Sequence, residues 1–216
     1  MRANQILFTL LLCVIIAYSA VCQSSVSSIG ISAEPAEISM SNKAPFGTET
    51  VIIKQPETFP QSWFGEYQGT LNIYKSDGLA QSIPMKMIMG KTDTAGVYRW
   101  NIIYGDDAEK GLRPYLLRTI DAKKGVYQCD ELNSIKMESY FVGNKLFCHY
   151  TVEGNDMTTV EEKSGDTFTF EIIFGKDKSI SETGGKKEQA TGENIPPVKT
   201  FPVVIYQKAV LKKVKL

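Results

Sequence analysis

Residues 63–74 alternate between two kinds of side chain with a period of two. The odd positions are apolar or small, and most of the even positions are polar. Successive side chains of a β-strand point to opposite faces of a sheet, so this pattern predicts a strand with one face in solvent. Similar segments recur along the chain, and none has the pattern of a convincing amphipathic helix. The sequence therefore predicts an antiparallel β-meander.

Ten segments in total look like strands, and turn signals rich in Gly, Asn and Asp separate them. They are residues 63–74, 83–89, 97–104, 115–120, 126–129, 135–142, 145–153, 157–162, 167–174 and 201–211. Their spacing of about ten residues favours a barrel or sandwich over alternating strands and helices. We expect an all-β fold: a single antiparallel up-and-down β-barrel of about ten strands.

The chain begins with a secretory signal peptide, predicted over residues 1–22. Arg2 precedes an apolar run of about a dozen residues, which is shorter than the ~20 needed to cross a bilayer, and no later segment approaches that length. The residues before Gln23 fit a cleavage site, whereas those before Cys22 also resemble a lipoprotein signal in which Cys22 carries a lipid. We expect an extracytoplasmic protein, secreted or periplasmic, that is either soluble or anchored by lipid at Cys22.

The remainder of the chain divides by composition into a leader and one barrel domain. Residues 23–58 are rich in Ser, Ala, Glu and Pro, which predicts a flexible leader in which only residues 50–54 look like a strand. We assign residues 59–216 to the barrel, a length that suits one domain. Within it, residues 175–200 carry almost no large apolar side chain, so we expect a long flexible loop between the last two strands.

Charge and histidine content exclude several classes of function. The chain has 24 basic and 24 acidic side chains, and removal of the signal peptide takes away Arg2, which leaves 24 − 1 = 23 basic ones. A nearly neutral protein is not built to bind the nucleic-acid backbone. With His149 as the single histidine, a catalytic triad and a multi-histidine zinc site are both disfavoured. We expect no enzymatic activity, no catalytic residue, no metal site and no cofactor.

Two cysteines, Cys129 and Cys148, follow the signal peptide. A tight turn at residues 143–144 would place Cys148 opposite Ser139, and the turn at residues 130–134 would place Cys129 opposite Lys136. The cysteines would then lie two strands apart, at ~9 to 10 Å, beyond the ~7 Å that a disulfide spans. We expect two free buried thiols, with a disulfide as the alternative if the register differs.

The opening strand carries the pattern Trp63-x-Gly65-x-Tyr67-x-Gly69. Followed by an antiparallel meander of about ten strands, it resembles the calycin-type barrels: lipocalins, fatty-acid-binding proteins and nitrobindin-like heme barrels. The resemblance covers roughly residues 60–211. The segment of residues 113–135 is also similar to uncharacterised secreted bacterial barrels. The resemblance implies a lipocalin-like barrel whose lumen decides what the protein does.

An inward-facing set of aromatic and methionine side chains makes the lumen a candidate site for a hydrophobic or amphipathic small molecule. Gly65 and Gly69 would leave room beside large aromatic rings, and thioether side chains adapt to irregular ligands. Arg99, Arg113 and Arg118 are candidate carboxylate anchors, although each also fits a surface position. The predicted ligand-binding residues are Trp63, Tyr67, Met85, Met87, Tyr98 and Trp100.

Two classes of function remain open at this stage. In the first, the barrel holds a ligand in an ordered cavity; heme is a further version, but alternation puts His149 on the face opposite the lumen. In the second, the same aromatic and methionine stripes form a packed core, and the outer surface engages other proteins of the cell envelope. A filled lumen with an exposed apolar patch would favour the second class.

Overall fold

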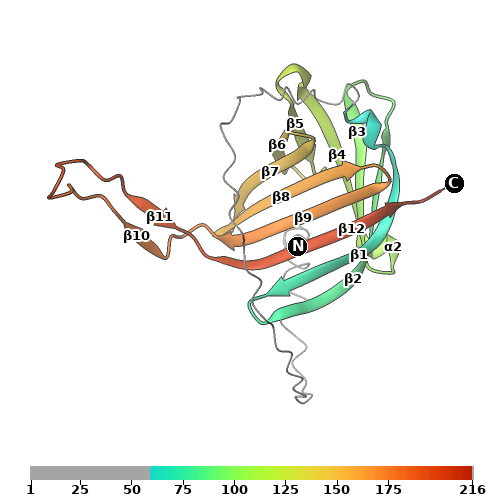
Figure 1. Ribbon diagram of the computed structural model, residues 1–216. Helices are drawn as coiled ribbons and strands as arrows, with labels where there is room; N and C mark the ends of the chain where they lie inside the picture. Colours follow the sequence, from blue (N-terminus) through green and yellow to red (C-terminus); the bar gives the residue numbers. More distant parts are fainter. Residues whose placement is uncertain (1–58, 216) are drawn as a thin grey trace, which may run out of the picture. The chain divides into compact units, whose positions relative to one another are not determined.

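A computed structural model describes residues 59–215 (Figure 1). The predicted signal peptide, the Cys22 anchor and the leader, with its strand-like residues 50–54, lie outside the described residues. Within residues 59–215, ten strands close into an antiparallel up-and-down barrel. The predicted fold class and strand number are therefore confirmed.

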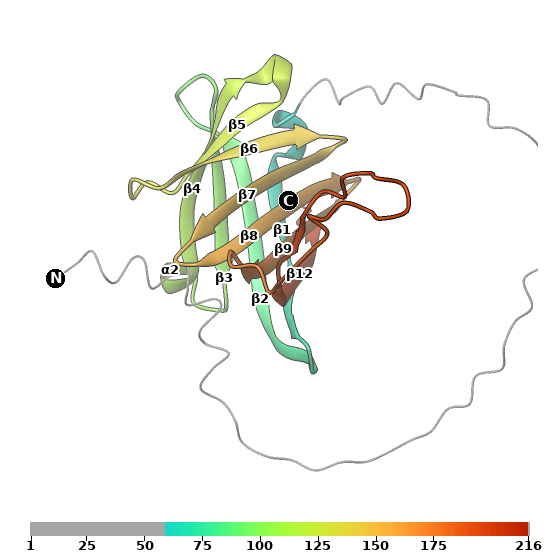
Figure 2. The same cartoon turned by 90° about the vertical axis from the view of Figure 1, so that its left-hand side faces the viewer.

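Each barrel strand overlaps one of the ten predicted segments. The strands are β1 (Gly65–Lys75), β2 (Gly78–Lys91), β3 (Val97–Tyr104), β4 (Leu112–Asp121), β5 (Val126–Asp130), β6 (Lys136–Val142), β7 (Lys145–Val152), β8 (Asn155–Ser164), β9 (Thr167–Lys176) and β12 (Val203–Lys213). Neighbours in the chain are neighbours in the barrel, and β12 returns to pair with β1. Figure 2 shows the strongly tilted strands from the side.

Among the described residues, three short helical segments accompany the strands: one precedes β1, and two lie in connections. They are the 3-10 helices η2 (Gln61–Trp63) and η3 (Ala122–Lys124) and the α-helix α2 (Ala108–Gly111). Trp63, predicted to begin the first strand, instead ends η2, where its backbone N–H donates to the Pro60 carbonyl at 3.0 Å. The chain thus turns before β1 and places the Trp63 ring in the barrel interior, where the side chain is buried.

The segment predicted as a loop at residues 175–200 contains a two-stranded sheet instead of irregular chain alone. Its strands are β10 (Ser181–Thr183) and β11 (Val198–Thr200), which pair through three rungs. Figure 1 shows this hairpin extending away from the ends of β9 and β12. Three residues are too few to show an alternating pattern, and every one of these six residues is exposed, so composition gave no sign of the hairpin.

The predicted register is right at one hairpin and shifted by one residue at the next. Cys148 pairs with Ser139, as expected. Cys129 pairs with Met137 and not with Lys136. The turn before β6 holds Leu132 and another residue at positive φ, and this conformation takes up one more residue than a tight turn does. The shift matters because residues directly opposite each other share a face, so Met137 and not a lysine faces the interior.

The glycines of β1 do not leave the space that the sequence predicted. A Cβ atom at Gly69 would lie 2.6 Å from the Val210 carbonyl oxygen and 3.1 Å from the Leu211 side chain. At Gly65, which has φ +145°, it would lie 2.8 Å from the Lys213 side chain. Neighbouring chain from β12 fills these positions, so Gly69 serves the close approach of β1 to β12.

Replacement of Gly69 by alanine should therefore destabilise the barrel. The new methyl group would meet backbone and not a flexible side chain, so we expect a loss of about 1–3 kcal/mol in the free energy of unfolding. Gly90→Ala on β2 is the matched control, because a Cβ there meets nothing within 4 Å. Urea unfolding of the two variants checks the prediction, and equal midpoints would contradict it.

Candidate functional site

The predicted ligand-binding residues all lie on the inner face of the barrel or at its rim. Trp63, Tyr67, Met85, Met87 and Trp100 are buried. Tyr98 is partly exposed, and its hydroxyl accepts a hydrogen bond from Gln61 Nε2 at 3.2 Å. The structure thus brings five of these six side chains together inside the barrel, as the alternation indicated.

Seven aromatic rings, which we call the aromatic cluster, fill the end of the barrel where the chain enters. They are Phe59, Trp63, Tyr67, Trp100, Tyr127, Phe141 and Phe168. Phe59 stacks on Phe141 with ring centroids 3.9 Å apart, and Trp63 stacks on Trp100 with centroids 6.1 Å apart. The three predicted aromatic site residues therefore pack mainly against other rings. Phe59 escaped the sequence analysis because it precedes the alternating pattern.

The three candidate carboxylate anchors do not point freely into the barrel. Arg118 Nε pairs with Asp130 Oδ2 at 2.9 Å on the outer face, and Arg99 is exposed beside the inward Trp100. Arg113 Nη1 donates to the backbone carbonyls of Lys110 and Leu112 at 3.1 and 2.9 Å. Arg113 and Arg118 are therefore engaged by neighbouring protein groups, and Arg99 lies on the outer surface.

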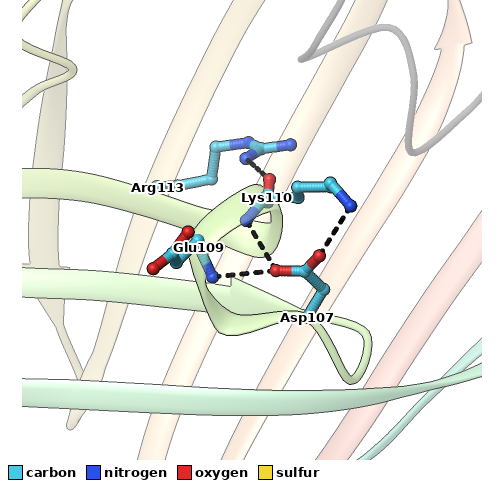
Figure 3. Close-up of polar contacts among 4 residues, drawn as sticks. All are labelled: Asp107, Glu109, Lys110 and Arg113. Atoms are coloured by element: carbon cyan, nitrogen blue, oxygen red, sulfur yellow. Dashed lines mark hydrogen bonds and ion pairs between the residues drawn. The ribbon is translucent and has the colours of Figure 1, made fainter.

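Figure 3 shows how the connection between β3 and β4 holds Arg113 in place. The Asp107 carboxylate caps α2 by accepting hydrogen bonds from the backbone N–H groups of Glu109 and Lys110, both at 3.1 Å. It also pairs with Lys110 Nζ at 2.9 Å, and the hydrogen bond from Lys110 lowers the pKa of Asp107. This compact turn presents the Lys110 carbonyl to Arg113.

A buried carboxylate borders the aromatic cluster. Glu161 on β8 is 8% exposed, and its Oε2 accepts a hydrogen bond from Trp100 Nε1 at 2.9 Å. Burial raises its pKa to about 7, although the indole hydrogen bond opposes the shift. Sequence alternation already placed adjacent acidic residues on opposite faces. It did not single out Glu161 as the inward member, although Met157 and Thr159 share its face.

A second group of polar side chains, which we call the polar lumen cluster, lies on the inner face of β4, β5 and β7 and directly after β5. Its members are Tyr115, Cys129, Glu131, Cys148 and Tyr150. They interact electrostatically, and burial is the main cause that raises the pKa of both tyrosines and both cysteines, that of Cys148 to about 11. The thiols are therefore protonated near neutral pH, so neither is a ready nucleophile.

Two buried oxygen atoms on the inner face have no hydrogen-bond partner. Glu131 is 6% exposed; its Oε2 accepts from Asn133 Nδ2 at 3.1 Å, whereas its Oε1 has no partner that meets hydrogen-bond geometry. Burial raises the pKa of Glu131, while hydrogen bonding from the side chains of Asn133 and Tyr115 and the positive charge of Arg113 oppose the shift. Gln207 on β12 is 1% exposed, and its Oε1 is also unpartnered. Buried polar atoms without a hydrogen-bond partner are rare in native proteins, so each of these two requires an explanation.

His149 lies on the outer face of β7. Its side chain is 64% exposed, and its Nδ1 is 2.8 Å from Thr158 Oγ1 and 3.4 Å from Asp156 Oδ1. A heme iron inside the barrel would be out of its reach. Among residues 59–215, no three or more His, Cys, Asp or Glu side chains group to hold a metal ion. The same residues contain no helix long and apolar enough to span a membrane.

Comparison with known proteins gives no relative. No protein-family model, curated protein or solved structure matches this chain. The closed ten-strand antiparallel barrel agrees with the calycin-type barrels in architecture alone. The chemistry of the interior must therefore be argued from its own residues.

The raised pKa of Glu161 predicts a pH-dependent stability. The protonated carboxyl is favoured in the native state, so its contribution is full below pH 4.5 and is lost as the pH rises through about 7. Glu161→Gln should remove this loss. We expect the free energy of unfolding of the variant, relative to wild type, to rise by about 3 kcal/mol between acidic and mildly alkaline pH. Denaturant unfolding at several pH values measures it, and a constant difference would contradict it.

The two cysteines should behave as unbridged thiols of low reactivity, with Cys148 buried and Cys129 half-buried. The structure leaves Cys129 and Cys148 free, and their raised pKa values disfavour the reactive thiolate. In a protein without residues 1–22, a thiol-alkylating reagent should add two labels under denaturing conditions without reductant, and should react slowly with the native state. Mass spectrometry counts the labels. Absence of label after denaturation would reveal a disulfide.

Proposed function

We propose that this protein is a secreted or envelope barrel that binds an amphipathic small molecule in its lumen. The observation that carries the proposal is the pair of buried, unpartnered acceptors on the inner face, Glu131 Oε1 and Gln207 Oε1. Leaving a buried polar atom unpaired costs about 1–3 kcal/mol. A bound molecule with a polar end removes that cost, while its apolar part contacts the neighbouring side chains.

The inner face offers the apolar and polar surfaces that such a ligand needs. The aromatic cluster forms one end, and Met85 and Met87 of β2 provide adaptable apolar wall. Tyr115 and Tyr150 face inward and are only partly exposed. Ligand sites are commonly apolar walls with a few convergent polar groups, which is the combination found here. The proposed ligand thus lies beyond the aromatic cluster, with Trp100 and Glu161 at its inner limit.

The proposed location outside the cytoplasm rests on the signal-like residues 1–22, and the proposed kinship to calycins rests on the closed barrel. Both fit a protein that holds a poorly soluble molecule in an aqueous compartment. Cys22 would fix the barrel to a membrane if it carries a lipid.

An exposed apolar group supports the alternative, a barrel that engages other proteins through its outer surface. It surrounds the β10–β11 hairpin, where Ile180 is 70% and Val203 67% exposed and Val198 and Phe201 are also exposed. Exposed apolar side chains that gather in one region mark interaction sites more often than scattered ones do. The two functions predict different effects of a substitution inside the lumen on ligand binding and on stability.

A lumen-filling substitution separates the two functions. Cys129 faces inward, so Cys129→Phe should occupy ligand space and weaken binding of the neutral fluorescent probe phenylnaphthylamine about tenfold or more, with little loss of stability. Gln128→Phe points outward from the same strand and should bind as wild type does. Fluorescence titration and thermal unfolding are the measurements. A wild type that binds no probe, together with an overpacking loss of about 1–3 kcal/mol in Cys129→Phe, would mean a packed lumen and would refute the proposal.

Native mass spectrometry of the protein purified from its own source provides a second readout. A co-purified molecule should appear in wild type and be lost in Cys129→Phe. The Gln128→Phe variant should retain it.

A further inference from the structure

The polar groups that face the lumen beyond the aromatic cluster are unevenly divided between acceptors and cations. Glu131, Glu161 and Gln207 are buried, and two of them carry an oxygen atom without a partner. The antiparallel topology puts the β3–β4, β5–β6 and β7–β8 connections at one end of the barrel, where Arg113 and Lys176 are two cations near the lumen. This inventory decides which head group the lumen accepts.

Both cations already have acceptors. Arg113 donates to the Lys110 carbonyl, as Figure 3 shows, and to the Leu112 carbonyl. Lys176 Nζ donates to Asn155 Oδ1 at 2.6 Å and lies 5.8 Å from the centre of the Phe174 ring. The hydroxyls of Tyr115 and Tyr150 and the thiols of Cys129 and Cys148 also face the lumen, and all four are neutral near pH 7 because burial raises each pKa.

A carboxylate head group would be poorly matched to these surroundings. It would lie near the Glu131 carboxyl, where Arg113 and Lys176 already have acceptors, and like charges at short range disfavour each other. A head group that donates hydrogen bonds would instead supply the partner that Glu131 Oε1 lacks. If it is also cationic, the hydrogen bond becomes charge-assisted and stronger.

We propose that the lumen selects amphipathic ligands whose polar end is a protonated amine, and that Glu131 Oε1 accepts its hydrogen bond. This inference rests on the proposed function and names the ligand class for the same site. Gln207 lies five strands around the barrel from β5, on the opposite wall. It provides a second acceptor for a donor elsewhere on the ligand.

The proposal implies a dependence on pH. An ammonium group beside Glu131 favours its ionised form, so binding releases a proton wherever the free carboxyl is protonated. Affinity for an amine should therefore rise with pH through the elevated pKa of Glu131, then level off until the amine itself loses its proton at a pKa of about 10. A carboxylate ligand would show the opposite trend in the acidic range.

A comparison of decylamine, decanol and decanoate tests the head group with the apolar chain held constant. Each is titrated by calorimetry, below its micelle concentration and near neutral pH, into the protein without residues 1–22. We expect decylamine to bind about tenfold or more tightly than the other two, the range of a hydrogen bond to a charged group. Glu131→Gln should abolish this preference. Glu138→Gln removes an exposed carboxylate on β6 and should retain it.

The possible outcomes separate this inference from the proposed function. Equal or tighter binding of decanoate would overturn the inference and leave ligand binding intact. Equal binding of decanol and decylamine would also overturn it, because a neutral donor would then suffice. Failure of all three ligands, together with failure of phenylnaphthylamine, would refute the proposed function as well. The wild-type comparison holds even if Glu131→Gln fails to fold.

Discussion

The pairing of β1 with two partners is the constraint on which the rest of the structure depends. Residues 65–75 pair with β2, and residues 67–74 pair with β12 at the same time. Gly69 permits this double pairing because the Val210 carbonyl takes the place that a side chain would occupy. Closure removes the exposed edges of the sheet and turns one face of every strand inward. The lumen and the set of side chains that face it exist because of that closure.

Closure also forces two different chemistries into one interior. Aromatic rings fill one end, where Phe59, Trp63 and Phe141 stack or pack edge to face. Carboxyl, amide, hydroxyl and thiol groups occupy inner positions beyond the aromatic cluster, toward the other end of the barrel. Glu161 joins the two regions through its hydrogen bond to Trp100. Apolar groups at these positions would avoid the cost of burying polar atoms, so the presence of the polar groups favours a binding role.

The fold alone does not identify the function, because the same barrel architecture binds many unrelated ligands in different proteins. The buried acceptors favour a ligand in the lumen, and the exposed residues around the β10–β11 hairpin favour an outer interface. The two surfaces belong to different parts of the chain, so one protein can use both.

The sequence by itself determined the strands, their order and the inward set, because alternation with a period of two is a local property. It predicted ten strands, the pairing of Cys148 with Ser139, and the outward position of His149. These features need only the pattern of each segment and the length of its turns.

Tertiary structure decided what local patterns cannot express. The shift that pairs Cys129 with Met137 depends on positive φ angles within a turn. The space beside Gly69 is filled by β12, which lies more than a hundred residues away in the chain. The role of Glu131 depends on which donors and cations lie across the lumen, and strand periodicity does not show which distant groups face each other. Long-range packing set these features, since it alone determines which atoms are left without partners.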